Sequence, residues 1–295
     1  MDVADVERIL KKKAHQVEFG PNGRGISQTL KRKIEALQLP GITFIRDSKR
    51  FYPNGTFASY VVGYAQKDEK KKEVVGKMGI EKQFNEQLKE KDGKVYYKGD
   101  QQGFKLPHSD ETIVPPQNGK DVYLTIDKKI QTFLEDAMNA VEKQYAPKKM
   151  IAIVADAKTG AILAMSTRPS FNPNKRNIEN YLNDAIAYPY EPGSTMKIFT
   201  LAAAVNEGVF QANETYQSGS YQVGSHRIRD HNKVGWGKIT FLEGVQRSSN
   251  VAFAKIVREK LGEDRFLQYL HRFHFNEPTG IELPGEKAGN ILYRY

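Results

Sequence analysis

Ser194 and Lys197 have the residue types and the spacing of a serine nucleophile and its base, within the segment PGSTMK at 192–197. A spacing of three puts both side chains on one face of a helix. The preceding proline and glycine place Ser194 in the first turn, where free N–H groups favour a developing alkoxide. Because the residues from 198 to 205 are nearly all apolar, we expect a helix that is buried on every side.

Burial is what would make Lys197 reactive. Removing an ammonium group from water lowers its pKa, and the uncharged amine can then take the proton of the Ser194 hydroxyl. The alternative is an ordinary capping serine beside a lysine whose amine reaches the surface. The serine–lysine pattern alone is too short to favour the catalytic interpretation, and the apolar helix brings the two interpretations close to parity.

A second polar cluster, Ser248-Ser249-Asn250, interrupts a predicted helical run over residues 241–260. At a kink or a junction between helices, the first and third side chains can point into one cleft. There the Ser248 hydroxyl could relay a proton, and the Asn250 amide could hold a substrate amide. The alternative is a polar N-cap that restarts a helix after Arg247.

Two other strings imitate catalytic patterns. The string SFN at 170–172 has a serine and an asparagine two apart, but it lies in a loop rich in proline and asparagine. The string KTG at 158–160 forms the tip of a predicted β-hairpin, where we expect a turn with glycine in a left-handed conformation. We therefore assign neither string to the site.

The chain has 295 residues, with 45 Lys+Arg against 35 Asp+Glu and no cysteine. Its length predicts two domains. The lack of cysteine excludes a disulfide scaffold, a thiolate metal site and a cysteine nucleophile. The net charge of +10 favours polyanions such as anionic lipid or wall polymer. No basic stripe is interleaved with aromatic residues and no zinc-knuckle spacing is present, so we expect no nucleic-acid partner.

Periodicity and helix-breaking residues predict the elements that must position these residues. Residues 106–119 contain three prolines, and we place a domain boundary near residue 117, which gives domains 1–117 and 118–295. Asp127 is expected to cap a helix to Tyr145, whose inward face carries Ile130, Phe133, Leu134, Ala137 and Val141. Helices are also expected over 2–13, 27–37, 80–88, 194–206, 241–260 and 263–273. Strands are expected over 42–55, 94–98 and 122–126, and in a hairpin over 150–167 too apolar to have a solvated face.

Three ordered motifs resemble those of one family. YEPGSTMK at 190–197, RSSNVAF at 247–253 and TGIELPGE at 279–286 are similar to the class B penicillin-binding proteins, the D,D-transpeptidases that cross-link peptidoglycan. The second motif reads S-S-N here. IVADAKTGAILAM at 153–165 looks like the start of that family's catalytic domain, and RFYPNG at 50–55 looks like part of its N-terminal pedestal. The resemblance covers essentially the whole chain.

The resemblance implies an α+β fold, with an N-terminal pedestal of the dimerisation type and an incomplete transpeptidase domain, in which helices back a sheet beside a helical subdomain. It implies that Ser194 is the acylated nucleophile, Lys197 its base, and Ser248 the group that passes a proton to the leaving D-Ala amine. It implies that Asn250 binds the donor peptide or a β-lactam side chain, and that the Ser194 N–H supplies half of an oxyanion hole. No metal and no organic cofactor are implied.

The implied partners are peptidoglycan stem peptides, β-lactam antibiotics and membrane proteins of the division or elongation machinery. The implied location is the extracytoplasmic face of the bacterial membrane, although the chain shows neither a membrane helix nor a signal sequence. The family's K-[ST]-G motif, expected downstream of Asn250, is not reached before Tyr295. We therefore expect a fragment of a longer protein, with an unpaired apolar sheet edge and with impaired or no activity.

Two alternative functions stay open. One is a non-catalytic module, in which the pedestal binds division or elongation partners. The other is hydrolysis, as in a β-lactamase or a carboxypeptidase. The N-terminal domain over 1–117, which β-lactamases lack, and the absence of an obvious glutamate after Asn250 to activate water both disfavour hydrolysis.

Overall fold

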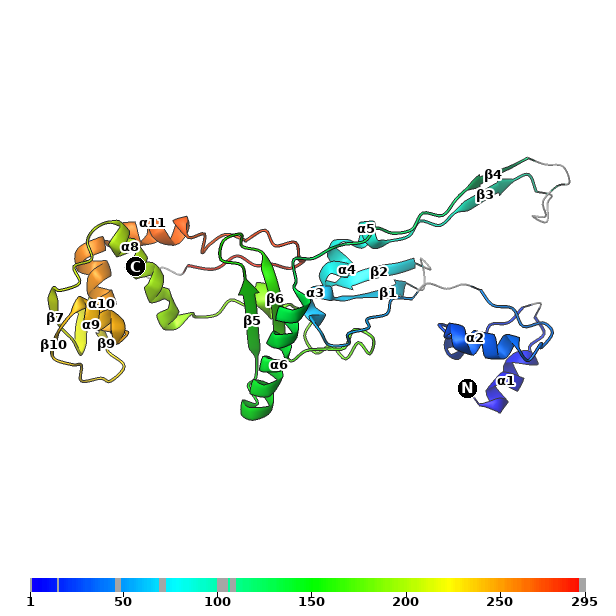
Figure 1. Cartoon of the computed structure of the whole chain (residues 1–295), viewed down its shortest axis with the longest axis horizontal. Helices are drawn as coiled ribbons and strands as arrows, with labels where there is room; N and C mark the ends of the chain where they lie inside the picture. The colour runs from blue at the N-terminus through cyan, green and yellow to red at the C-terminus, as the bar shows by residue number, and fades with distance from the viewer. Residues whose placement is uncertain are drawn as a thin grey trace. The chain divides into compact units, whose positions relative to one another are not determined.

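In the computed structural model, the described residues are 2–14, 16–45, 49–68, 73–99, 106 and 110–291. The chain divides into two compact units, Met1–Ala185 and Ile186–Tyr295. In both units helices accompany short antiparallel strand pairs, and each sheet formed by the described residues has two strands (Figure 1). This mixture of helices and strands confirms the predicted α+β class.

Two amphipathic helices begin the first unit, both close to their predicted bounds. α1 spans Val3–Leu10 and α2 spans Gln28–Glu35, with a 3₁₀ turn, Gly20–Gly23, between them. Asp2 caps α1 and Ser27 caps α2, since each side chain accepts a hydrogen bond from a backbone N–H in the first turn. Neither helix has a buried residue.

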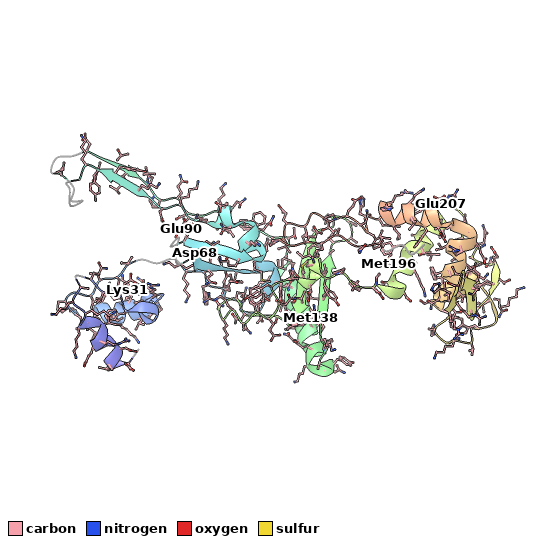
Figure 2. All side chains as sticks on the ribbon, turned by 180° about the vertical axis from the view of Figure 1, so that it is seen from behind. Lys31, Asp68, Glu90, Met138, Met196 and Glu207 are labelled. Atoms are coloured by element: carbon pink, nitrogen blue, oxygen red, sulfur yellow. The ribbon has the colours of Figure 1, made fainter. Side chains whose placement is uncertain are left out.

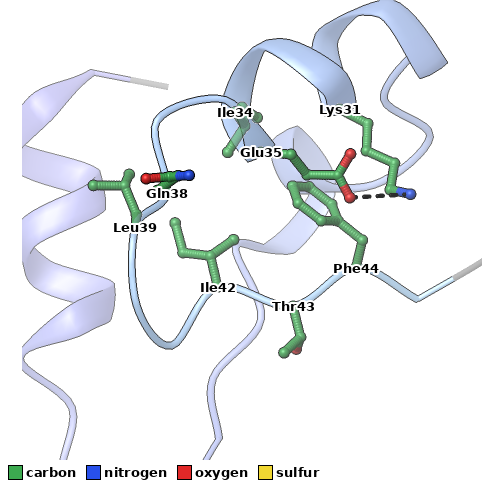
Figure 3. Close-up of a pocket in the computed structure, with 8 residues that line it drawn as sticks. All are labelled: Lys31, Ile34, Glu35, Gln38, Leu39, Ile42, Thr43 and Phe44. Carbon is green, nitrogen blue, oxygen red and sulfur yellow. Dashed lines mark ion pairs between the residues drawn. The ribbon is translucent and has the colours of Figure 1, made fainter.

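The segment after α2 is not the predicted edge strand. Residues 42–45 and 49–55 form no strand, and residues 46–48 lie outside the described residues. Figure 3 shows Ile42 and Phe44 instead lining a pocket beside α2, where the Lys31 and Glu35 side chains form an ion pair of 3.2 Å. Two apolar residues of this segment therefore face α2 rather than a partner strand, whereas Ile45 and Phe51 are largely exposed.

The centre of the first unit is a strand pair packed against short helices. These elements are α3 (Ser59–Val62), β1 (Tyr64–Asp68), β2 (Glu73–Met78), α4 (Gly79–Gln83) and α5 (Asn85–Leu88). Their buried cluster contains Tyr60, Tyr64, Met78 and Phe171. Next along the chain, β3 (Lys94–Tyr97) and β4 (Glu111–Val114) form an antiparallel ribbon in which every residue is exposed.

α6 spans Lys128–Tyr145, and Asp127 caps it by accepting a hydrogen bond of 2.9 Å from Ile130 N, as predicted. The predicted inward face of α6 is wrong. The buried residues are Gln131, Glu135 and Met138, whereas Phe133 is 69% exposed. Met138 is labelled on this helix in Figure 2.

A buried ion pair explains which face of α6 turns inward. Arg168 Nη2 lies 2.8 Å from Glu135 Oε2, and both residues are buried. Glu135 Oε1 also accepts hydrogen bonds from Ala58 N and Ser166 Oγ. A buried charge is tolerated only when it is paired and hydrogen-bonded, so the polar face of α6 must turn toward Arg168.

The predicted hairpin is confirmed as β5 (Met150–Ala155) paired with β6 (Ile162–Arg168). Its two faces are not both dry, however, because burial alternates along β5 and leaves Ile151 and Ile153 exposed. The predicted strand over 122–126 is wrong. This segment reaches β6 through hydrogen bonds from Thr125 Oγ1 to Ile162 O and from Asp127 N to Leu163 O, without the ladder that a strand needs.

The second unit contains all four predicted site residues. α7 (Asp184–Ala187) and a 3₁₀ turn, Gly193–Met196, precede α8 (Lys197–Asn206), and β7 (Thr215–Gln217) pairs with β10 (Lys238–Thr240). β8 (Ser220–Val223) pairs with β9 (His226–Arg229). The remaining elements are α9 (Phe241–Gln246), α10 (Asn250–Lys255), a π-helical turn (Ile256–Leu261) and α11 (Glu263–Arg272).

α8 is not buried on every side, which corrects the expectation from its apolar sequence. Ala203 and Ala204 are fully buried, but Ile198 is 69% exposed and Val205 is 56% exposed. α8 packs against α10, α11 and the π-helical turn. Contact on one face leaves the other apolar face in water, and Lys197 is half-buried at the start of the helix.

In the part of the chain that the structure describes, no helix combines the length and the apolar character needed to cross a membrane. The domain boundary near residue 117 stays a prediction.

Replacing Asp127 tests the cap of α6. We expect Asp127→Ala to lower the free energy of unfolding by about 1 kcal/mol, because Ile130 N then lacks its acceptor. Asp136→Ala is the matched control, since it removes an exposed carboxylate from the middle of the same helix, and we expect a change within about 0.5 kcal/mol. Equal losses in urea unfolding of the two variants would contradict the capping role.

Candidate active site

Ser194 lies in an exposed 3₁₀ turn rather than in the first turn of an α-helix. The turn spans Gly193–Met196, and Gly193 has a positive φ of 61°. The Thr195 hydroxyl donates a hydrogen bond of 2.7 Å to Pro192 O, which fixes the turn. Met196, labelled in Figure 2, ends the turn, and α8 begins at Lys197. The Ser194 hydroxyl is therefore open to solvent and to a substrate.

The Lys197 amine contacts the second polar cluster. Nζ donates to Ser248 O at 2.6 Å, to Ser248 Oγ at 3.1 Å and to Asn250 Oδ1 at 2.6 Å. It also lies 5.5 Å from the centre of the Phe253 ring. Burial lowers the pKa of Lys197, and the charge of Asp230 opposes this shift only in part. The amine is thus held among neutral acceptors and is easier to deprotonate than an ordinary lysine.

The residues between α9 and α10 form a tight turn that aims two side chains at Lys197. Ser248 has a left-handed φ of 53°, which is uncommon for a residue with a Cβ. Ser249 caps α10, because its Oγ accepts a hydrogen bond of 3.0 Å from Ala252 N. The N-cap interpretation is therefore correct for Ser249, while Ser248 and Asn250 contact the Lys197 amine.

The structure brings together three of the four predicted site residues. Lys197, Ser248 and Asn250 are in hydrogen-bond contact. Within the described residues, no hydrogen bond joins Ser194 Oγ to Lys197 Nζ, because the donors of the amine are directed to the 248–250 turn. Ser194 lies one turn before Lys197 in the chain, but the expected stacked pair of hydroxyl and amine is not formed in this state.

The two imitating strings behave as expected. KTG at 158–160 is a turn, in which Asp156 Oδ1 accepts hydrogen bonds from Lys158 N and Thr159 N. These hydrogen bonds lower the pKa of Asp156. Gly160 has a left-handed φ of 75°. In SFN at 170–172, the side chain of Phe171 is 1% exposed and belongs to the core.

Sequence reasoning missed Asp230, a carboxylate beneath the 248–250 turn. It is 2% exposed and accepts hydrogen bonds from Ser249 Oγ and Val251 N. The one available signal is its position as a lone acidic residue in the basic segment HRIRDHNK at 226–233.

In the part of the chain that the structure describes, no group of three or more histidine or acidic side chains is arranged to hold a metal ion.

Comparison with known proteins identifies the family. The model of the penicillin-binding protein dimerisation domain matches residues 1–124, and that of the penicillin-binding protein transpeptidase domain matches residues 150–295. The chain belongs to the class B penicillin-binding proteins. The resemblance drawn from the sequence motifs is thereby confirmed. The two matches leave residues 125–149 between them, so they do not test the exact boundary.

Individual relatives agree with this family. The chain is 37% identical over 299 residues to stage V sporulation protein D of Bacillus subtilis, covering 99% of this chain and 45% of the relative. It is 33% identical over 277 residues to the peptidoglycan D,D-transpeptidase FtsI of Buchnera aphidicola, covering 92% of this chain and 47% of that protein. The chain spans about half the length of the curated relatives it matches.

A solved structure agrees with the fold of the penicillin-binding proteins. The crystal structure of penicillin-binding protein 2X from Streptococcus thermophilus superposes with a TM-score of 0.82 at 32% sequence identity. The superposition covers 99% of this chain and 45% of that chain.

The left-handed conformation of Ser248 makes a prediction about two substitutions that both remove its hydroxyl. We expect Ser248→Gly to be more stable than Ser248→Ala, with a free energy of unfolding about 1 kcal/mol higher. The reason is that alanine keeps a Cβ at φ 53°, whereas glycine has none. Ser225, an exposed turn serine without a positive φ, is the control position. There we expect the glycine variant to be no more stable than the alanine variant. The same order at both positions would contradict a strained turn.

Proposed function

We propose that the chain supplies the pedestal and the nucleophile-bearing part of a serine D,D-transpeptidase, which cross-links peptidoglycan through an acyl-enzyme on Ser194. The observation that carries the proposal is the contact of the Lys197 amine with both Ser248 and Asn250. The relatives named peptidoglycan D,D-transpeptidases support the same reaction. The activity itself, the substrate and the partners belong to this proposal.

The first half of the reaction transfers an acyl group to the enzyme. Lys197 Nζ, as the uncharged amine, takes the proton of Ser194, and Ser194 Oγ attacks the carbonyl carbon of the D-Ala–D-Ala peptide bond. A C–O bond forms, the C–N bond breaks, and D-Ala leaves. The proton reaches the leaving amine through Ser248, whose Oγ lies 3.1 Å from Nζ. Burial of Lys197 supports the first step, because it lowers the pKa of the amine.

The second half returns the enzyme to its starting state. The amine of a neighbouring stem peptide attacks the acyl carbon and gives its proton back through the same groups, so that the cross-link forms and Ser194 is released. The Ser194 turn is exposed, which leaves room for both peptides. A β-lactam would acylate the same hydroxyl. No metal or organic cofactor takes part in this scheme.

Asn250 supports two roles at once. Its Oδ1 accepts from Lys197 Nζ, and its Nδ2 donates to Arg229 O at 2.8 Å. A side-chain amide has a second lone pair and a second N–H, which stay available for the amide of a donor peptide. We therefore assign Asn250 both to holding Lys197 and to binding the stem peptide.

The proposal also covers location and partners. We place the chain at the extracytoplasmic face of the bacterial membrane, where stem peptides are found, and assign it to peptidoglycan synthesis during cell division or cell elongation. Membrane proteins of the division or elongation machinery are its proposed protein partners.

Labelling with a fluorescent penicillin tests the nucleophile in the full-length gene product that contains these residues. We expect covalent label on the peptide with residues 190–197 and loss of that label in Ser194→Ala. Ser225→Ala is the matched control, because it removes an exposed serine hydroxyl outside the 192–197 turn and should keep the label. The measurement is peptide mapping by mass spectrometry together with in-gel fluorescence.

The possible outcomes of this labelling separate the alternatives. Stable label on Ser194 supports the acyl-enzyme, whereas rapid loss of the label and turnover of the penicillin would support a hydrolase. A folded protein that takes no label would support the non-catalytic module and would overturn the proposed function.

A further inference from the structure

The buried carboxylate of Asp230 is not used in the reaction steps above, yet it is hydrogen-bonded to the turn that carries Ser248 and Asn250. We propose that Asp230 is a positioning residue, which fixes the 248–250 turn so that both side chains meet the Lys197 amine. This inference rests on the proposed function of Ser194 and Lys197 and adds a residue to it.

Asp230 gathers donors from two separate segments. Its Oδ1 accepts from Ser249 Oγ at 2.8 Å and from Val251 N at 3.1 Å. Its Oδ2 accepts from Gly219 N at 2.8 Å, and Asp230 N donates to Gly219 O at 3.0 Å. The carboxylate therefore ties the turn between α9 and α10 to the base of the β8–β9 hairpin.

The anchored atoms are next to the functional ones. Ser249 and Val251, which donate to Asp230, alternate in the sequence with Ser248 and Asn250, whose side chains reach Lys197 Nζ. Arg229, the residue before Asp230, contributes a further anchor, because its backbone O accepts a hydrogen bond of 2.8 Å from Asn250 Nδ2. The left-handed Ser248 is thus held by its neighbours, as a sparsely populated backbone conformation requires.

The anchor is built for a charged carboxylate. Burial acts to raise the pKa of Asp230, but hydrogen bonds from Gly219 N, Val251 N and Ser249 Oγ outweigh it, so the net pKa is lowered. The carboxylate thus stays ionised in its 2% exposed site. An asparagine has nearly the same shape but only one acceptor oxygen. It can serve Gly219 N or the donors of the turn, but not both.

The charge of Asp230 also acts on the pKa of Lys197. This pKa distinguishes the proposed role from a purely structural one, because a structural role alone would not change it. The groups in contact with Nζ, from Ser248, Asn250 and Phe253, are neutral, and the negative charge of Asp230 raises the pKa of Lys197 against the effect of burial. Removing that charge must lower the pKa of Lys197 further. Because acylation needs the uncharged amine, the acid limb of its pH–rate profile must move to lower pH.

The test compares Asp230→Asn with a matched control in the full-length gene product. Ser218→Ala is the control. The Ser218 hydroxyl is also buried, next to Gly219, and it donates to Gly237 O and accepts from Trp236 N, without contact to the 248–250 turn. For each protein, the rate of acylation by fluorescent penicillin is measured across pH, together with the thermal midpoint. Ser249→Ala, which removes one of the donors to Asp230, is the third variant.

We expect Asp230→Asn to acylate about 100-fold more slowly at its pH plateau, because its misplaced turn no longer presents Ser248 and Asn250 correctly. Its acid limb should move to lower pH. Ser249→Ala should also slow acylation but leave the acid limb in place, because it keeps the Asp230 charge. Ser218→Ala should have a lower thermal midpoint than the wild type. Its acylation rate should stay within about twofold of the wild-type rate, because removing the Ser218 hydroxyl leaves the reacting groups in place.

Two results would overturn this inference in different ways. A wild-type protein that labels on Ser194, with an Asp230→Asn variant that acylates at the wild-type rate or loses no more than Ser218→Ala, would overturn the positioning role alone. A wild-type protein that takes no label would overturn the proposed function and this inference with it.

Discussion

The proposed mechanism depends on one constraint: the amine of Lys197 must be held by acceptors that leave it uncharged often enough to act as a base. Its hydrogen bonds come from a single short turn, through Ser248 O, Ser248 Oγ and Asn250 Oδ1. A carboxylate in direct contact would hold the amine as an ammonium ion, whereas here partial burial lowers the pKa of Lys197. The charge of Asp230 acts on the amine without a direct ion pair, and the same carboxylate accepts hydrogen bonds from the turn.

The neighbouring elements can be understood from this constraint. α9 must stop and α10 must restart within a few residues, which the left-handed Ser248 and the cap of Ser249 achieve. The β8–β9 hairpin must end in a residue that can bind that turn, and Asp230 does so. Each unit contains a buried carboxylate of this kind, because Glu135 of the first unit likewise accepts hydrogen bonds from residues distant in the sequence. Buried polar groups with every partner in place fix a geometry more sharply than apolar contacts do.

Local signals in the sequence predict much of this structure. The cap of Asp127 and the helix to Tyr145, the hairpin over 150–167 and the break at Ser248–Asn250 were all visible in short patterns, as were the two imitating strings. What failed depends on partners far away in the chain. The inward face of α6 is set by Arg168, about thirty residues later, and α8 is apolar all round but packs on one face. Asp230 could not be singled out, because its role exists only once the hairpin meets the 248–250 turn.

The most direct test of the account is the titration of the Lys197 amine itself. Carbon-13 labelling of lysine side chains, with Lys197→Arg to assign the signal, allows its pKa to be followed by NMR in the full-length gene product. The account predicts a midpoint below the ordinary value of 10.5 in the folded protein, returning to that value on denaturation. A midpoint at or above 10.5 in the folded protein would show that Lys197 is held as an ammonium ion, and would contradict its role as the base.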